Sequence, residues 1–152
     1  MTGPADASLP DGEDRALLTA TEGLLLRPLH PQWIKNGEIN VSAFLPIKVD
    51  EGEFSVDRAS LSTPEESYQR RIRLKRKSAG TWGIAISAVI EAGSRALADP
   101  IFANEAEGIE ANPAHAVIDF RGLDADGEED LATVLWEDAT QRGCLYKAPP
   151  PT

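Results

Sequence analysis

The chain has 152 residues, with 25 acidic against 15 basic side chains and a formal net charge of −10. This length fits one domain, and the acidic balance works against non-specific binding to nucleic acid or to an anionic membrane surface. A single cysteine, Cys144, excludes a disulfide within one chain and a multi-cysteine metal site. No apolar run reaches the length of a membrane span, so we expect a cytoplasmic protein.

Composition also predicts where the folded part begins and ends. Residues 1–14 are rich in Pro, Gly, Asp and Ala and have almost nothing to bury, which predicts a disordered tail. Residues 148–152 are predicted to form a short Pro-rich tail. Residues 15–147 between them are predicted to form a single domain.

The first part of this domain is predicted to hold two strands joined by a turn. Residues 23–29 carry three consecutive leucines between a glycine and His30-Pro31, a run too short for a buried helix. Pro31 is expected to begin a single helical turn, which Asn36-Gly37 closes. Residues 39–45 alternate apolar and polar side chains with period two, which is typical of a half-buried strand.

The clearest local signal is a helix start. Thr63 is a good N-cap, Pro64 suits the first helical position, and Glu66 stands where a capping box needs a carboxylate. The helix is predicted to run from Pro64 to about Lys75. Residues 81–86 follow as a central strand, and residues 87–92 as a short helix.

The second half of the domain adds strands and one long helix. Residues 104–112 are acidic and are expected to form an exposed loop, and residues 116–120 a strand. Residues 128–142 have Leu131, Val134 and Leu135 at core spacing, which predicts a helix ending before Gly143. Together the elements predict an α+β fold: a mixed sheet of four or five short strands with two main helices.

Two histidines are the first candidates for chemistry. His30 and His115 stand at the edges of the two best strand candidates. If those strands pair, both imidazoles and Asp119 would converge on one sheet edge, as a general base or as part of a metal site. The alternative is that each imidazole caps a strand end or bonds a loop carbonyl. The lack of a His-x-His or His-Glu-x-x-His spacing favours this structural role.

A basic run and an aromatic residue are candidates for binding. Residues 70–77 hold six of the 15 basic side chains. On a helix, Arg70, Arg73 and Lys77 lie around one face, which suggests a patch for a phosphate-bearing ligand or an acidic partner. The alternative is a solvated face that offsets the surrounding acidic residues. Trp33 lies on the turn between two strands, so it is the tryptophan most expected to be available to a partner.

Glycine-rich nucleotide-binding loops and a Gly-x-Ser-x-Gly elbow are absent from the sequence, and we expect no cofactor. Five motifs follow one another along the chain: His30-Pro31-x-Trp33, Ala43-Phe44-x-Pro46, residues 61–66, Gly80-x-Trp82 and residues 115–120. This order of motifs resembles a set of small bacterial proteins that have no assigned activity. The resemblance covers residues 24–146 and implies a bacterial, cytoplasmic, single-domain protein.

Two functions from different classes fit these observations. The first is a small acidic accessory protein that docks on a larger protein partner, in the manner of an antitoxin or an immunity protein, without catalysis. The alternative is a small hydrolase or transferase that uses His30, His115 and Asp119 at a sheet edge. Geometry separates them, because imidazoles within about 4–6 Å of each other or of a carboxylate, inside a concave pocket, favour the enzyme.

Overall fold

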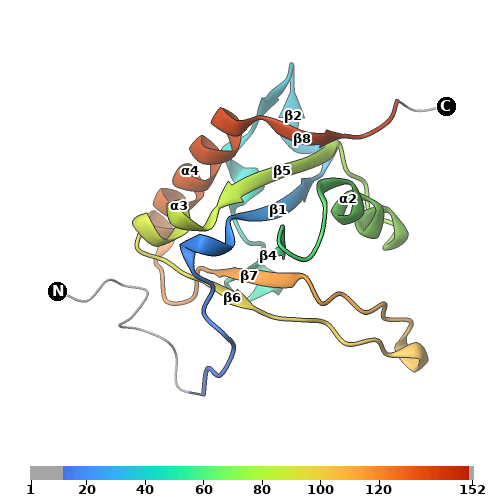
Figure 1. Ribbon diagram of the computed structural model, residues 1–152. Helices are drawn as coiled ribbons and strands as arrows, with labels where there is room; N and C mark the ends of the chain where they lie inside the picture. The colour runs from blue at the N-terminus through green and yellow to red at the C-terminus, as the bar shows by residue number, and fades with distance from the viewer. Residues whose placement is uncertain (1–11, 151–152) are drawn as a thin grey trace.

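A computed structural model describes residues 12–150, and its centre is one antiparallel sheet (Figure 1). Of the tails predicted at residues 1–14 and 148–152, residues 1–11 and 151–152 lie outside the described residues. The strand order in this sheet is β6-β7-β4-β1-β5-β8. The strands are β1 (Leu24–Leu29), β4 (Glu53–Arg58), β5 (Gly80–Ala85), β6 (Ala96–Ala98), β7 (His115–Asp119) and β8 (Cys144–Lys147).

The α+β class predicted from the sequence is confirmed, but two details of the prediction are wrong. Within residues 12–150 the main sheet has six strands instead of four or five, and every neighbouring pair is antiparallel instead of mixed. The two main helices are α2 (Pro64–Arg73) and α4 (Ala125–Arg142), and the short helix predicted over residues 87–92 is α3 (Ile86–Glu91). A fully antiparallel sheet needs no crossover helices, so its helices are free to gather at either face.

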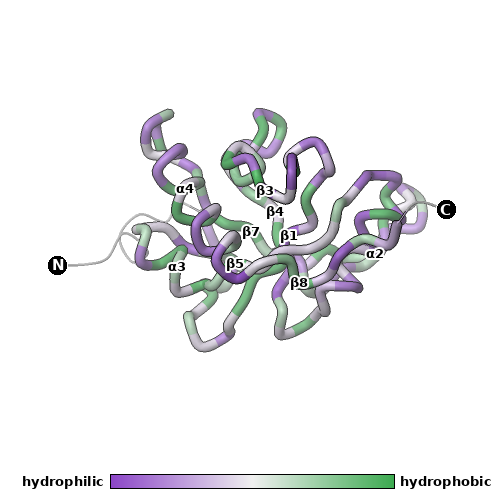
Figure 2. Tube along the Cα trace, turned by 90° about the horizontal axis from the view of Figure 1, so that it is seen from above, coloured by the Kyte–Doolittle hydropathy of each residue, from purple (hydrophilic) through white to green (hydrophobic). Residues whose placement is uncertain are grey.

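The two faces of the sheet have different covers. Figure 2 shows α3 and α4 on one side and α2 on the other. On β4, the alternate residues Phe54 and Val56 enter the main hydrophobic cluster with α4. Asp57, which points the opposite way, contacts Ser67 on α2 instead. The period-two alternation of a strand therefore gives β4 an apolar face and a polar face, and the polar face meets α2.

Helix α2 begins where the sequence predicts. Thr63 accepts a hydrogen bond from the Glu66 amide at 3.1 Å, so the predicted N-cap is confirmed. The helix ends at Arg73, two residues before the predicted end, because Lys75 adopts a left-handed backbone conformation with φ of 62°. The Arg76 amide then bonds back to the Arg71 carbonyl at 3.3 Å, which closes a Schellman motif.

The prediction of a strand over residues 39–45 is wrong. Only Glu38–Ile39 (β3) is extended there, and it forms a hairpin with β2 (Ile34–Lys35) across Asn36-Gly37. The chain then enters a 3-10 turn, η3 (Val41–Phe44), which Asn40 caps by accepting from the Ser42 amide at 2.8 Å. The turn buries Ala43 and Phe44 against the core, a result that the period-two pattern did not predict.

Helix α4 starts earlier than the predicted residue 128. Asp124 accepts from the Gly127 amide at 2.8 Å, so the cap lies four residues before the predicted start. The helix buries Leu131 and Leu135 in the main cluster. It also holds β3, just ahead of η3, because the Trp136 indole donates from Nε1 to the Ile39 carbonyl at 2.7 Å.

The remaining segments lie before, between or beyond the strands of the main sheet. The segment ahead of η1 (Ala20–Glu22) runs beside β6, where Leu17 pairs with Leu97. Residues 99–114 leave the sheet between β6 and β7 as a long excursion, hereafter the arm, which includes η5 (Glu105–Glu107). Two further 3-10 turns lie ahead of strands. Turn η2 (Pro31–Trp33) precedes β2, and turn η4 (Lys48–Asp50) precedes β4. Across residues 12–150, no helix is long and apolar enough to span a membrane.

Candidate functional site: an arginine-lined pocket

A cavity of about 300 Å³ lies between β1, β4, the C-terminal end of α2 and the arm. Four arginines, two carboxylates and one imidazole reach it, and the formal charge of these groups is +2 with a neutral histidine. This local balance opposes the −10 of the whole chain. The lining side chains are Leu26, Arg27, Pro28, Ser55, Val56, Asp57, Ser67, Arg70, Arg71, Leu74, Arg76, Ile101, Ile109, Glu110, Asn112 and His115, with Gly108.

The pocket exists because β1 and β4 separate. Their pairing is limited to Leu25 with Arg58 and Leu26 with Asp57. The Ala59 amide bonds to the Leu24 carbonyl, so the even-numbered residues of β1 direct their backbone groups at β4. Pro28 is the next such residue after Leu26, and proline has no N–H to donate. The ladder of hydrogen bonds between β1 and β4 therefore ends at Pro28, and a gap between the two strands opens beside Ser55.

Arg27 fills this gap. Its Nη1 atom donates to the Ser55 carbonyl oxygen at 2.8 Å, in place of the backbone donor that Pro28 lacks. The guanidinium carbon lies 4.2 Å from the centroid of the Phe54 ring, a cation–π distance. Arg27 thus projects a half-buried positive charge from the face of β1 that also carries Leu25 and Leu29.

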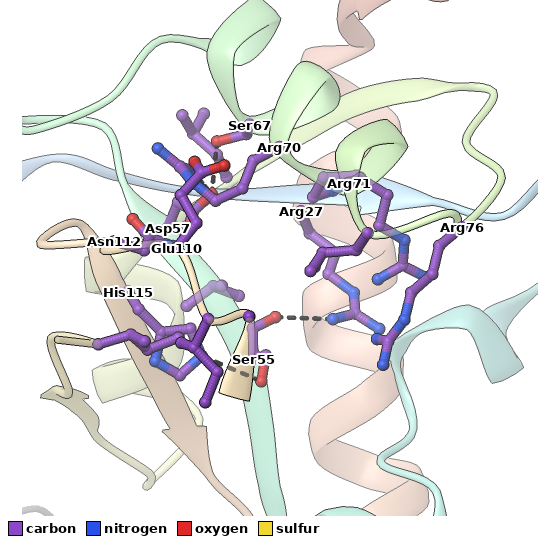
Figure 3. A pocket seen from close by; sticks show the side chains of 17 residues that line it. Arg27, Ser55, Asp57, Ser67, Arg70, Arg71, Arg76, Glu110, Asn112 and His115 are labelled. Carbon is purple, nitrogen blue, oxygen red and sulfur yellow. Dashed lines mark hydrogen bonds and ion pairs between the residues drawn. The ribbon is translucent and has the colours of Figure 1, made fainter. Parts of the chain in front are cut away.

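The end of α2 brings two more arginines to the same side. The left-handed turn at Lys75 reverses the chain, so Arg76 lies next to Arg71. Figure 3 shows Arg27, Arg71 and Arg76 grouped on one side of the pocket, while Asp57, Arg70 and Asn112 stand across from them. The grouping joins a sheet residue to two residues that flank a helix end.

The carboxylates of the pocket are already paired with other groups. Asp57 is buried and accepts from Ser67 at 2.7 Å, from Arg70 at 2.9 Å and from Asn112 at 2.9 Å. Glu110 accepts two hydrogen bonds from Arg73, at 2.8 and 2.7 Å. These bonds tie the arm to β4 and to α2. They also leave Arg27, Arg71 and Arg76 without an ion pair to any residue in the range 12–150.

Of the three remaining cations, Arg27 and Arg71 are incompletely hydrogen-bonded, and all three repel one another. The Nε atoms of Arg27 and Arg71 are shielded from solvent and bond to nothing among the described residues. Burial, followed by the charge of Arg71, lowers the pKa of Arg27 to about 10. Burial, followed by the charge of Arg76, lowers the pKa of Arg71. An anion in the pocket would supply both the missing acceptors and the missing negative charge.

His115 lies on the opposite wall and has two partners, Asp99 at the start of the arm and Ser55 on β4. Its Nδ1 atom is 2.8 Å from the Asp99 carbonyl oxygen and 3.3 Å from the Asp99 carboxylate. Its Nε2 atom is 3.2 Å from Ser55 Oγ. Ser55 pairs with Val117 while His115 pairs with Asp57, so Ser55 and His115 are diagonal neighbours on one face of the sheet.

The convergence of His30, His115 and Asp119 that the sequence analysis considered does not occur. Strand β4 separates β1 from β7, and His30 follows β1 at one end of the sheet while His115 begins β7 at the other. His30 caps η2 by accepting from the Gln32 amide at 3.0 Å. Asp119 lies four residues beyond His115, roughly 13 Å along the strand, and pairs with Arg121. Among residues 12–150, no cluster of three ligating side chains suits a metal ion.

The four residues predicted to bind a partner lie in different surroundings. Arg70 reaches the pocket and pairs with Asp57. Arg73 lies outside the pocket and links Glu66 to Glu110. Lys77 is exposed beyond the end of α2 and does not line the pocket. Trp33 is half-buried and packs against the main hydrophobic cluster.

Arg27, Ser55 and Asp57 line the pocket but were not among the residues predicted to bind a partner, whereas Arg71 and Arg76 come from the basic run 70–77 that was. One signal was present in the sequence. Leu25, Arg27 and Leu29 alternate on β1, so a strand pattern places Arg27 among side chains that face the core. A charge at such a position is unusual and marks a functional or specially compensated residue. No protein-family model, curated protein or solved structure matches this chain.

Proposed function

We propose that the chain is a binding protein whose arginine-lined pocket holds a phosphate-type anion carried by a small molecule. The observation that carries the proposal is the convergence of Arg27, Arg71 and Arg76 on one cavity, with no carboxylate partner among residues 12–150. Guanidinium groups match the oxygens of a phosphate in pairs, and three of them suit a group that carries nearly two negative charges.

The shape of the pocket supports a small ligand. Its volume of about 300 Å³ is at the lower end of the range for small-molecule sites. Arg27 and Arg71 are half-buried, so a group on the flat surface of a folded protein would reach them less readily than a free ligand. Leu26, Pro28 and Val56 add apolar walls beside the cations. These walls suit a ligand with a short hydrocarbon part.

The acidic surface of the chain supports selectivity for compact anions. A net charge of −10 repels nucleic acid and anionic membranes as a whole, while the pocket offers a local positive charge at short range. The expectation that the chain docks on a larger protein partner as an accessory protein stays a prediction. It is compatible with the pocket if docking depends on the bound ligand.

The test is stabilisation by inorganic phosphate. A ligand that binds only the folded state raises stability by RT ln(1 + [L]/Kd), so 10 mM phosphate with a Kd of about 1 mM would add about 1.4 kcal/mol, or about 4 °C in melting temperature. Arg71→Met should lose this shift. Lys77→Met removes the same charge from the same segment outside the pocket and should keep it.

Chloride at matched ionic strength is the second control. It should produce a clearly smaller shift, because a monovalent spherical ion cannot accept several forked hydrogen bonds at once. Equal shifts with chloride and phosphate, or equal shifts in the Arg71→Met and Lys77→Met variants, would show that phosphate acts by screening the whole surface and would refute the site.

A further inference from the structure

The side chains of Ser55, His115 and Asp99 form a hydroxyl–imidazole–carboxylate series at the wall of the arginine-lined pocket. We propose that Ser55 and His115 hydrolyse a carboxylic ester whose phosphate-type group is held by the pocket arginines. The proposal rests on the proposed function for the binding of its substrate, and it goes beyond that function by assigning a reaction.

The hydrogen bonds determine which nitrogen of His115 carries the proton. The carbonyl oxygen of Asp99 is only an acceptor, so Nδ1, at 2.8 Å, must donate to it. In a neutral ring Nε2 then carries the lone pair and faces Ser55 Oγ at 3.2 Å. This is the tautomer that a general base needs in order to take the serine proton.

The second acceptor at Nδ1 identifies the part played by Asp99. Its carboxylate Oδ2 lies 3.3 Å from Nδ1, close enough to stabilise an imidazolium when Ser55 has given up its proton. Asp99 does not line the pocket, so it acts through His115 and is a positioning residue. Its backbone carbonyl would hold the same tautomer even without the carboxylate.

The position of Ser55 links this series to the arginines. Its hydroxyl faces His115, and its carbonyl oxygen accepts from Arg27, so one residue contacts both walls of the pocket (Figure 3). Ser67 is a useful contrast in the same pocket. Its hydroxyl donates to the Asp57 carboxylate at 2.7 Å and has no imidazole partner, so it lacks a base of suitable basicity.

The reaction needs no reactant other than the ester and water. Ser55 Oγ forms a bond to the ester carbonyl carbon while its proton passes to His115 Nε2. The bond from that carbon to the alcohol oxygen then breaks, and the imidazolium returns the proton to the departing alkoxide. Water attacks the acyl-serine in the same way, giving a carboxylic acid and free Ser55. The proposed donor to the developing oxyanion is Arg27, whose guanidinium bonds to the backbone carbonyl oxygen of Ser55.

The first experiment uses a fluorophosphonate probe, which reacts with an activated serine and releases fluoride. Mass spectrometry of the full chain after proteolysis should place the adduct on Ser55 and not on Ser67. His115→Gln should lower the labelling rate by about 10²–10⁴-fold, the usual contribution of a general base. Absence of an adduct on Ser55, or equal rates in wild type and His115→Gln, would overturn the proposed hydrolysis.

The second experiment measures turnover of 1-acetylglycerol 3-phosphate and of uncharged p-nitrophenyl acetate. Asp99→Asn should lower kcat on the phosphorylated ester by about tenfold to 100-fold without raising KM. Arg71→Met should raise KM for the phosphorylated ester alone. Because both esters would use His115 as the base, Asp99→Asn should slow the hydrolysis of both. A raised KM in Asp99→Asn, or an equal loss for both esters in Arg71→Met, would contradict these roles, and absent turnover of the phosphorylated ester would also overturn the reaction.

The phosphate-induced rise in melting temperature separates the two proposals. Ser55→Ala should abolish labelling and turnover but keep the phosphate shift, which also shows that the variant is folded. If wild type shows the shift and no labelling, the pocket binds anions and does not hydrolyse esters. If the shift itself is missing, the binding function fails first, and labelling of Ser55 by the uncharged probe still reports on its reactivity.

Discussion

Arg27 donates to the Ser55 carbonyl oxygen from a position where the backbone of Pro28 would otherwise be the donor. A side chain thus replaces a strand hydrogen bond, and the replacement leaves a half-buried cation at the opening of the sheet. Ser55 in turn aims its hydroxyl at His115. One missing N–H on β1 therefore accounts both for the gap between β1 and β4 and for the position of the first pocket arginine.

The first prediction concerns a substitution that restores the backbone N–H at position 28. Pro28→Val supplies a donor that can pair with the Ser55 carbonyl, so Arg27 should lose its place there. The affinity for phosphate should then fall by about tenfold, as expected when one charged hydrogen-bond donor (about 1.5 kcal/mol) is withdrawn. Phosphate titration followed by melting temperature, with hydrogen exchange of the new amide, measures both effects. An unprotected amide with unchanged affinity would count against this account of the gap.

The second prediction concerns the stability cost of unpaired cations. Arg71 makes no side-chain hydrogen bond within residues 12–150, and its buried Nε faces the field of Arg76. Arg71→Met keeps an unbranched apolar side chain and removes the charge repulsion, so the free energy of unfolding should rise by about 0.5–1 kcal/mol without phosphate. Urea denaturation measures the change, with Lys77→Met as the control. A marked loss of stability would show that Arg71 has a structural role.

The third prediction tests the left-handed turn at the end of α2. Lys75 has φ of 62°, a conformation that costs an ordinary residue about 1–2 kcal/mol and glycine little. After allowing for the greater freedom of glycine in the unfolded chain, Lys75→Gly should stabilise by about 0.5–1 kcal/mol and keep phosphate binding. Lys75→Val should destabilise and weaken binding, because a β-branched residue resists positive φ and would displace Arg76. Chemical denaturation of the Lys75→Gly and Lys75→Val variants measures both changes in stability.

The fourth prediction concerns the cap of α2. Thr63→Ala removes the acceptor for the Glu66 amide and should cost about 0.5–2 kcal/mol in the free energy of unfolding. Thr63→Asn keeps an acceptor at the cap and should recover most of the loss. Denaturation midpoints of the two variants give the comparison. If Ala and Asn were equivalent, the cap bond would contribute nothing to stability.

The fifth prediction is an acid dependence. Hydrogen bonds from Arg15, and then from Arg121, hold the pKa of Glu13 well below its ordinary value of 4.5. The unfolded chain therefore takes up this proton first, so the stabilisation is fully present above pH 4.5 and is lost as the pH falls towards the folded value. Glu13→Gln should be less stable at pH 7 and should lose less stability on acidification. Urea midpoints between pH 7 and pH 3 test this, and parallel curves would contradict it.

The sequence by itself determined the elements whose causes are local. Thr63, Pro64 and Glu66 specify the start of α2 through bonds within four residues. The leucine run ending at His30-Pro31 specifies β1, because the residue before a proline is held extended. The cap of α4 at Asp124 was equally local, but the helix was predicted to start only at residue 128, after Gly127.

Tertiary structure decided the rest, because period and spacing do not say which residues meet. Residues 41–44 became a turn when α4 offered Phe44 a buried site, which a local alternation cannot foresee. His115 was visible in the sequence, but its partners Ser55 and Asp99 arrive from positions 60 and 16 residues away. The arginine cluster likewise joins β1 to the end of α2. Contacts of this kind depend on strand order, and strand order is set by the packing of the whole core.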